Sequence, residues 1–157
     1  MGKLVVDKIK CISSSDGSDY LYFLVMRFDP NCTVHRVGPN NAWADMRNGE
    51  VRNADVVLVD KFSGEYIVAV IEEDDSFDFD MELRVRMSRA LRILYKFLST
   101  IEKDRGRRLG QMMIFFANLI GRLRTNDDLL SVQIVTTTNV MEVIGEGAHY
   151  KITLKAA

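Results

Sequence analysis

The sequence predicts a mainly β protein, an antiparallel β-sandwich of about eight strands with an inserted α-helical hairpin. Short apolar segments rich in β-branched residues alternate with turn sequences up to residue 72. The apolar spacing then changes to steps of three and four, which is typical of amphipathic helices, and the strand pattern resumes after residue 126. Because strand patterns flank the helices, we expect one domain over residues 1–157 with a hairpin inserted at residues 81–125.

The expected strands are separated by sequences that favour turns. Residues 13–19 contain four serines, two aspartates and a glycine, and residues 38–53 contain Pro39 and the Asn48-Gly49 pair. The segment 20–28 is almost continuously apolar, which indicates a strand covered on both faces or an interface. We expect strands at residues 4–12, 20–28, 33–37, 55–60, 66–71, 131–137 and 149–154.

The helical hairpin is predicted from two apolar stripes. The first stripe is Leu83, Met87, Leu91, Leu94, Leu98 and Ile101. The second is Leu109, Met112, Met113, Phe116, Ile120 and Leu123. The polar residues 102–108, which include Gly106, lie between the stripes, and a short polar turn between two helices predicts an antiparallel hairpin.

Composition supports one compact domain with an uneven charge distribution. The chain has 157 residues, 47% of them apolar, so its core needs neither a metal nor a disulfide. Residues 1–80 carry 15 acidic and 8 basic side chains, whereas residues 81–125 carry 3 acidic and 11 basic ones. The net charge of −1 therefore combines an acidic β domain with a basic helical insertion.

Cysteine content and the apolar segments bear on the cellular compartment. We expect Cys11 and Cys32 to be free thiols, although one optional bridge is compatible with the sequence. The apolar run that begins at Leu4 ends at Asp7, so no secretory signal peptide is predicted. The apolar stretch at residues 112–116 is far below the ~20 residues of a membrane span. These features predict a cytoplasmic protein, or one exported without a cleaved signal peptide.

Two loops concentrate carboxylates. One contains Asp16 and Asp19, and the other, residues 72–80, has six acidic residues among nine. Carboxylates this close repel each other, and calcium offsets such repulsion because it takes 6–8 oxygen ligands in flexible loops. The glycine and glutamate spacing of an EF-hand is absent. A solvated acidic loop that pairs with the basic helices is the alternative.

The order of these features is similar to that in a known family. The segment 9–25, with Asp16-Gly17-Ser18-Asp19 followed by Tyr20, resembles the first calcium loop of the C-two domains, which are calcium- and phospholipid-binding β-sandwiches. Residues 70–74 look like the start of their third calcium loop, and residues 126–132 look like its continuation. On this resemblance the helical hairpin is inserted inside the third loop.

The resemblance implies a set of calcium ligands. Glu72 stands where the family has an aspartate, and Tyr20 stands where proline is common, so the implied site holds one ion or none. The ligands carried over from the family are Asp19, Glu72, Asp74 and Asp128, with Asp16 and Asp78 in reserve.

The basic hairpin is the second candidate binding region. Arginine-rich amphipathic helices can lie on anionic lipid with apolar residues buried and the charges at the headgroups. The alternative is that one helical face packs on the sandwich or on a second copy. Nucleic acid is an unlikely partner because the rest of the chain is acidic. The candidate residues for a membrane or protein partner are Arg84, Arg89, Arg92, Lys96, Arg105, Arg107, Arg108, Phe115 and Phe116.

Catalysis has little support in the sequence. His35 and His149 lie in expected strands, and no nucleophile motif accompanies them. Gly145-Glu146-Gly147 lacks the remainder of a dinucleotide fingerprint and predicts a turn. We therefore expect a non-enzymatic, calcium-binding module that associates with an anionic membrane or a protein partner. Two alternatives stay open: a structural protein that self-assembles without calcium, and a membrane-disturbing toxin or effector.

Overall fold

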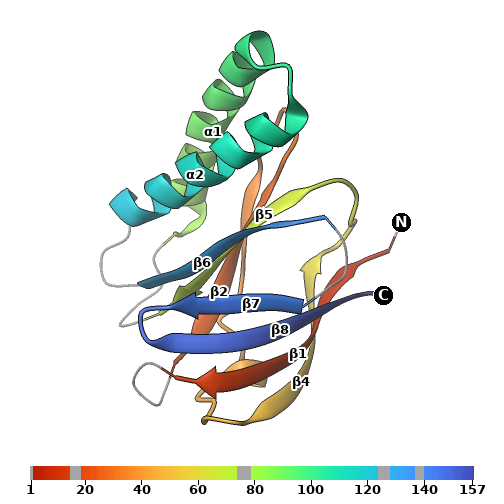
Figure 1. The fold of residues 1–157 in the computed structure, drawn as a ribbon, viewed down its shortest axis with the longest axis vertical. Helices are drawn as coiled ribbons and strands as arrows, with labels where there is room; N and C mark the ends of the chain where they lie inside the picture. The colour runs from red at the N-terminus through yellow and green to blue at the C-terminus, as the bar shows by residue number, and fades with distance from the viewer. Residues whose placement is uncertain (1, 15–18, 74–78, 124–127, 137–139) are drawn as a thin grey trace.

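The fold is known from a computed structural model, which describes residues 2–14, 19–73, 79–123, 128–136 and 140–157 (Figure 1). Elements follow the chain in the order β1 (Leu4–Ser13), β2 (Leu21–Arg27), β3 (Val34–Val37), the 3-10 helix η1 (Asn41–Trp43), β4 (Val51–Val59), β5 (Tyr66–Glu72), α1 (Met81–Ile101), α2 (Arg105–Leu123), β6 (Asp128–Val135), β7 (Val140–Gly145) and β8 (Ala148–Ala156).

The strands form two four-stranded sheets whose neighbouring strands are all antiparallel. One sheet has the order β4-β1-β8-β7 and is called the outer sheet here, and the other has the order β3-β2-β5-β6 and is called the central sheet. The helices α1 and α2 connect β5 to β6. The predicted fold class, a mainly β sandwich with an inserted helical hairpin, is confirmed.

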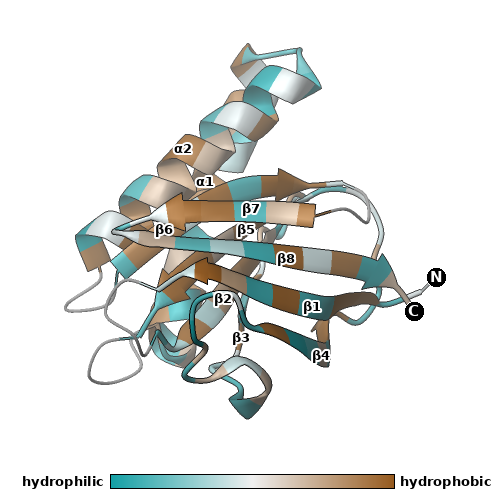
Figure 2. Cartoon of the chain, turned by 60° about the horizontal axis from the view of Figure 1, so that its bottom comes forward, coloured by the Kyte–Doolittle hydropathy of each residue, from teal (hydrophilic) through white to brown (hydrophobic). Residues whose placement is uncertain are grey.

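The first hydrophobic core fills the space between the two sheets. Alternate residues of β1 and β8 point into it, and Figure 2 shows the matching alternation of hydrophobic and hydrophilic residues along β8. The Trp43 indole also lies in this core, where its Nε1–H donates to the Leu21 carbonyl at 2.8 Å. This hydrogen bond fixes the long β3–β4 connection against β2.

A second hydrophobic core lies between the central sheet and the hairpin. Tyr22 and Leu24 of β2 and Ile67 of β5 face α1 and α2, while their strand neighbours face the outer sheet. Burial on both faces explains why residues 20–28 are almost continuously apolar. The molecule therefore has three layers, with the outer sheet and the hairpin on opposite sides of the central sheet (Figure 1).

Local side-chain chemistry sets the start of α1. The Asp80 carboxylate accepts a hydrogen bond from the Leu83 N–H at 2.9 Å, which is the pattern of an N-cap. The predicted stripe faces the second core from Leu83 as far as Leu98, but Ile101 is 61% exposed. The expectation for Ile101 was wrong because the helix ends there and its last turn lies beyond the sheet surface that covers Leu98.

Two further observations concern a strand that was not expected and the two cysteines. Strand β7 was not predicted, and it reaches Gly145, where the Glu146-Gly147 turn begins. Glu146 and Gly147 both have positive φ, so the turn expected there is present. Both cysteines are free and buried, Cys11 in the first core and Cys32 in the second.

Candidate functional site

Two predicted carboxylates lie at one end of the central sheet. In the strand register Leu21 pairs with Glu72, and Glu72 pairs with Asp128. Glu72 is 4% exposed and Asp19, two residues before Leu21, is 1% exposed. The Glu73 N–H donates to the Tyr20 carbonyl at 2.9 Å and continues the pairing past the end of β5. Strand pairing therefore accounts for the burial of Glu72, and neither this burial nor that of Asp19 was part of the expectation for the two acidic loops.

Asp19 takes part in a buried polar network. The Tyr150 hydroxyl of β8 donates to Asp19 Oδ2 at 2.6 Å, so this contact joins the two sheets. Burial, with the hydrogen bond to Asp19 and the charge of that carboxylate, raises the pKa of Tyr150 well above its usual value. Burial also raises the pKa of the Cys11 thiol, and a hydrogen bond with Tyr150 opposes this shift.

The implied calcium ligands are only partly covered by the structure. Asp16, Asp74 and Asp78 lie outside the described residues. Asp19, Glu72 and Asp128 lie at the same end of the central sheet. Within the described part of the chain, no group of three histidine, cysteine, aspartate or glutamate side chains is placed to hold a metal ion. Calcium binding at these residues therefore stays a prediction.

Several of the predicted hairpin residues face the protein. Phe116 is completely buried in the second core, and Phe115 is partly buried beside it. Arg84 is half-buried, its Nε–H donates to the Phe79 carbonyl at 3.0 Å, and burial together with the charge of Arg36 lowers its pKa. Arg108 is also half-buried. These residues therefore help to hold the hairpin against the central sheet.

Arg105 anchors the turn of the hairpin to the strands below it. Its guanidinium forms an ion pair with Glu65 at 2.8 Å and lies over the ring of Phe28, 4.9 Å from the ring centroid. Phe28 in turn contacts Tyr95 of α1 edge to face, with 5.4 Å between the ring centroids. Arg105 therefore joins α2 to the ends of β2 and β5, in a role that sequence reasoning did not assign.

The remaining predicted residues lie on the solvent side. Arg89, Arg92 and Lys96 are exposed on α1, and Arg107 is exposed near the turn. Exposed apolar side chains accompany them on α1: Val85 at 44%, Ile93 at 72%, Phe97 at 57% and Ile101 at 61%. Val85, Ile93 and Phe97 fall within about a third of the helix circumference, separate from the stripe that faces the sheet, whereas Ile101 continues that stripe at the end of the helix.

Sequence reasoning missed the apolar members of this surface. The signal was present, because Ile93 and Phe97 both fall outside the stripe that faces the core. We call the surface formed by Val85, Arg89, Ile93, Lys96 and Phe97 the α1 docking face. Neither α1 nor α2 has an apolar stretch of the length and composition that a membrane-spanning helix requires.

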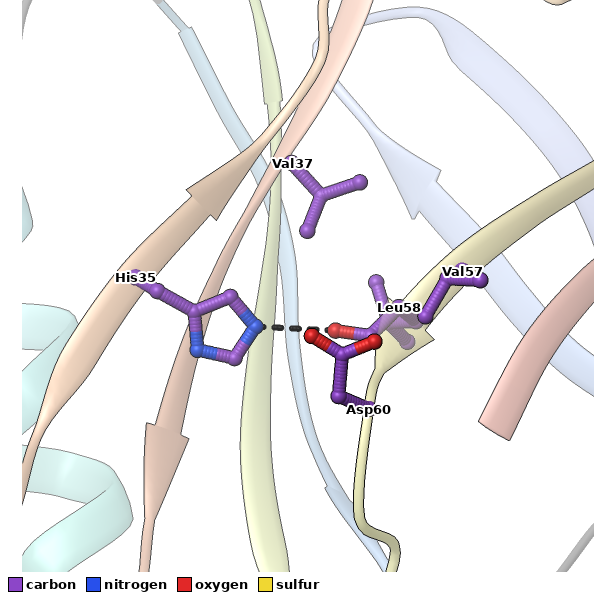
Figure 3. A pocket seen from close by; sticks show the side chains of 5 residues that line it. All are labelled: His35, Val37, Val57, Leu58 and Asp60. Carbon is purple, nitrogen blue, oxygen red and sulfur yellow. Dashed lines mark hydrogen bonds between the residues drawn. The ribbon is translucent and has the colours of Figure 1, made fainter. Parts of the chain in front are cut away.

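A cavity of about 470 Å³ opens between β3 and β4, the strands at one edge of each sheet. Figure 3 shows His35 and Asp60 among its lining residues, with His35 Nε2 bonded to the Leu58 carbonyl at 2.8 Å. Because a carbonyl can only accept, Nε2 carries the proton in this contact. The His35 imidazole thus connects β3 of the central sheet to β4 of the outer sheet. The other histidine, His149, pairs with Glu142 at 2.7 Å.

These features define the class of protein by its architecture, a two-sheet antiparallel β-sandwich with a helical hairpin inserted between β5 and β6. The chain matches no family model, no curated protein and no solved structure.

Proposed function

We propose that the chain is a non-enzymatic binding module that associates with anionic membranes through the α1 docking face. The observation that carries this proposal is the exposure of Ile93 and Phe97, at 72% and 57%, between the exposed basic residues Arg89, Arg92 and Lys96. A helix that lies in a membrane interface needs this combination of apolar and cationic side chains.

The expected binding is reversible and sensitive to salt. Burying a large apolar side chain contributes about 1.5–3 kcal/mol, and each basic residue near an anionic surface contributes about 1 kcal/mol. The cost of orienting the protein on the surface offsets part of this gain. Because the cationic contribution is screened, binding should weaken as the ionic strength rises.

Charge favours an anionic membrane over a second copy of the same face. Two α1 docking faces packed together would oppose Arg89 and Lys96 of one copy to the same residues of the other. Like charges held together in an interface cost free energy and suppress that pairing. Phosphate headgroups neutralise these cations while the acyl region accepts Ile93 and Phe97.

Co-sedimentation with vesicles tests the proposal. We expect the protein to pellet with phosphatidylserine-containing vesicles at low salt, and to pellet much less with phosphatidylcholine alone. Phe97→Ser and Arg89→Glu should each weaken binding about tenfold or more. The first removes an aromatic side chain that is buried in the bilayer interface, and the second replaces a cation that attracts anionic headgroups with an anion. Arg47→Glu, which changes an exposed arginine of the β3–β4 connection, is the matched charge control. Equal pelleting of the Arg89 and Arg47 variants would contradict the proposal.

Calcium binding at the carboxylate end is a second candidate function. It is supported by the burial of Asp19 and Glu72, by the pairing of Glu72 with Asp128, and by the resemblance to the C-two domains. Hard cations prefer such oxygen ligands. Titration calorimetry with calcium should give a binding isotherm that Asp128→Asn weakens and that magnesium does not reproduce. A flat calcium titration of the wild-type protein would remove this candidate.

A further inference from the structure

The outer sheet presents a second basic surface. Lys10 of β1 is the direct cross-strand partner of Lys151 of β8, and Lys8, two residues before Lys10, is paired with Thr153. All three lysines are exposed. Because residues two apart share a face of a strand, and direct partners lie side by side, the three ammonium groups belong to one patch. We call Lys8, Lys10 and Lys151 the lysine patch.

Carboxylates of the neighbouring strands match the lysine patch only in part, because Glu142 of β7 is the direct partner of Lys151. Like charges directly opposite each other across two strands destabilise a sheet. In the part of the chain that the structure describes, the three lysines have no ion-pair partner. Asp7 and Asp55 lie 3.1 and 3.9 Å from Lys155 Nζ, and the Glu142 carboxylate binds His149. Lys8 and Lys10 have no carboxylate as a direct ladder partner, so an external anion can supply their counter-charge.

Exposed apolar side chains lie next to the lysine patch in the same ladders. Val51 of β4 is the partner of Lys10, and Val140 of β7 is the partner of Thr153. Val51 is 53% exposed, Val140 is 54% exposed, and Ile144 on the same side of β7 is 64% exposed. A sheet face that mixes cations with exposed aliphatic groups has the chemistry of the α1 docking face, built on strands instead of a helix.

The two surfaces point in opposite directions. The lysine patch is on the solvent side of the outer sheet, and the α1 docking face is on the solvent side of the hairpin, with the central sheet between them (Figures 1 and 2). Resting on the proposed function, we infer that the protein bridges two anionic phospholipid surfaces. The α1 docking face holds one bilayer, and the lysine patch contacts the phosphate headgroups of a second bilayer.

Vesicle clustering tests this inference with the full chain. Turbidity and dynamic light scattering of phosphatidylserine-containing vesicles should report clustering on addition of wild-type protein, and co-sedimentation measures binding in the same samples. The variant Lys10→Glu/Lys151→Glu should still pellet with vesicles, because its α1 docking face is intact. Its clustering rate should fall about tenfold or more, since two cationic contributions change sign.

The matched control is Arg47→Glu/Lys61→Glu, which makes the same change in net charge at exposed residues of two connecting segments. We expect it to cluster vesicles like the wild type. Circular dichroism and a thermal melt establish that both variants are folded.

Each other outcome has a definite meaning. If the wild type pellets with vesicles but does not cluster them, the bridging inference is overturned and the proposed function stands. If the lysine variant clusters vesicles as fast as the wild type, the lysine patch is not the second contact and the inference is again overturned. If the wild type does not pellet at all, both proposals fail. If light scattering reports protein oligomers without vesicles, and clustering follows their concentration, a second copy of the chain and not the lysine patch makes the bridge.

Discussion

The Ser88 hydroxyl of α1 accepts a hydrogen bond from the Val34 backbone N–H of β3 at 3.1 Å and donates one to the Arg84 carbonyl at 3.0 Å. Strand β3 is at the edge of the central sheet, where an unpaired N–H would otherwise face the helix. The Ser88 side chain thus gives the Val34 N–H of the edge strand a hydrogen-bond acceptor and attaches the hairpin to that strand.

We predict that Ser88→Ala lowers the free energy of unfolding by about 1–2 kcal/mol, because it leaves the buried Val34 N–H without an acceptor. Urea denaturation followed by circular dichroism measures the change. Ser99→Ala is the matched control, since Ser99 is exposed and its hydroxyl donates only within the helix, to the Tyr95 carbonyl at 2.8 Å. A control variant as unstable as Ser88→Ala would refute this role for Ser88.

Gly145 is required by a close backbone contact with strand β6. A Cβ atom added to Gly145 would lie 2.4 Å from the Leu130 carbonyl oxygen, which belongs to the backbone and cannot rotate away. We predict that Gly145→Ala lowers the free energy of unfolding by about 1–3 kcal/mol, the size of an overpacking strain. Gly110→Ala in α2, where nothing lies within 4 Å, should instead stabilise the protein by up to about 1 kcal/mol. Thermal melts that show the same sign for both variants would contradict this account.

The contact between Arg105 and Glu65 should contribute modestly to stability. The two side chains are 51% and 24% exposed, so solvent screens the ion pair. A double-mutant cycle with Arg105→Ala and Glu65→Ala is expected to give a coupling energy of about 0.5–1 kcal/mol that decreases in high salt. The Arg105 variant alone should lose more stability than the Glu65 variant, because it also loses the contact with Phe28. Equal losses would show that this ring contact contributes nothing measurable.

Cys32 makes stability depend on alkaline pH. Burial, with the nearby charge of Asp29, raises the pKa of this thiol from 9.0 to about 12. Below pH 9 the thiol is protonated in both states, whereas between pH 9 and 12 the unfolded chain loses the proton and the folded chain keeps it. The free energy of unfolding should therefore fall as the pH rises through this window.

Cys32→Ala should show a shallower fall of the free energy of unfolding in urea titrations at pH 7.5 and 10.5 under reducing conditions. Cys11 and Tyr150, whose pKa values are also raised by burial, contribute to the slope that remains. Identical slopes for wild type and Cys32→Ala would overturn the assignment.

The elements that sequence reasoning located well are those with a clear local pattern. The helical stripe from Leu83 to Leu98 has a regular period, and β2 is apolar along its whole length. Strand β7 was missed although Met141 and Val143 alternate with exposed neighbours, because six residues next to a glycine turn give a weak signal.

The candidate sites depend on contacts that no local pattern contains. Asp19 and Tyr150 are far apart in the chain, and so are Arg105 and Glu65, yet each pair is in direct contact. The residue types at these positions could be read from the sequence, but strand register and helix placement decided which of them are buried. Lys10 and Lys151 become neighbours for the same reason, through the pairing of β1 with β8.

The second hydrophobic core makes the hairpin inseparable from the sandwich. Tyr22, Leu24 and Ile67 are completely buried on the side of the central sheet that α1 and α2 cover. A shortened chain in which a tight turn replaces residues 81–123 would expose this aliphatic and aromatic surface to water, and such a surface promotes aggregation. The insertion is thus a structural layer on which the solubility of the whole protein depends, and transplanting the sandwich without it would not yield a usable scaffold.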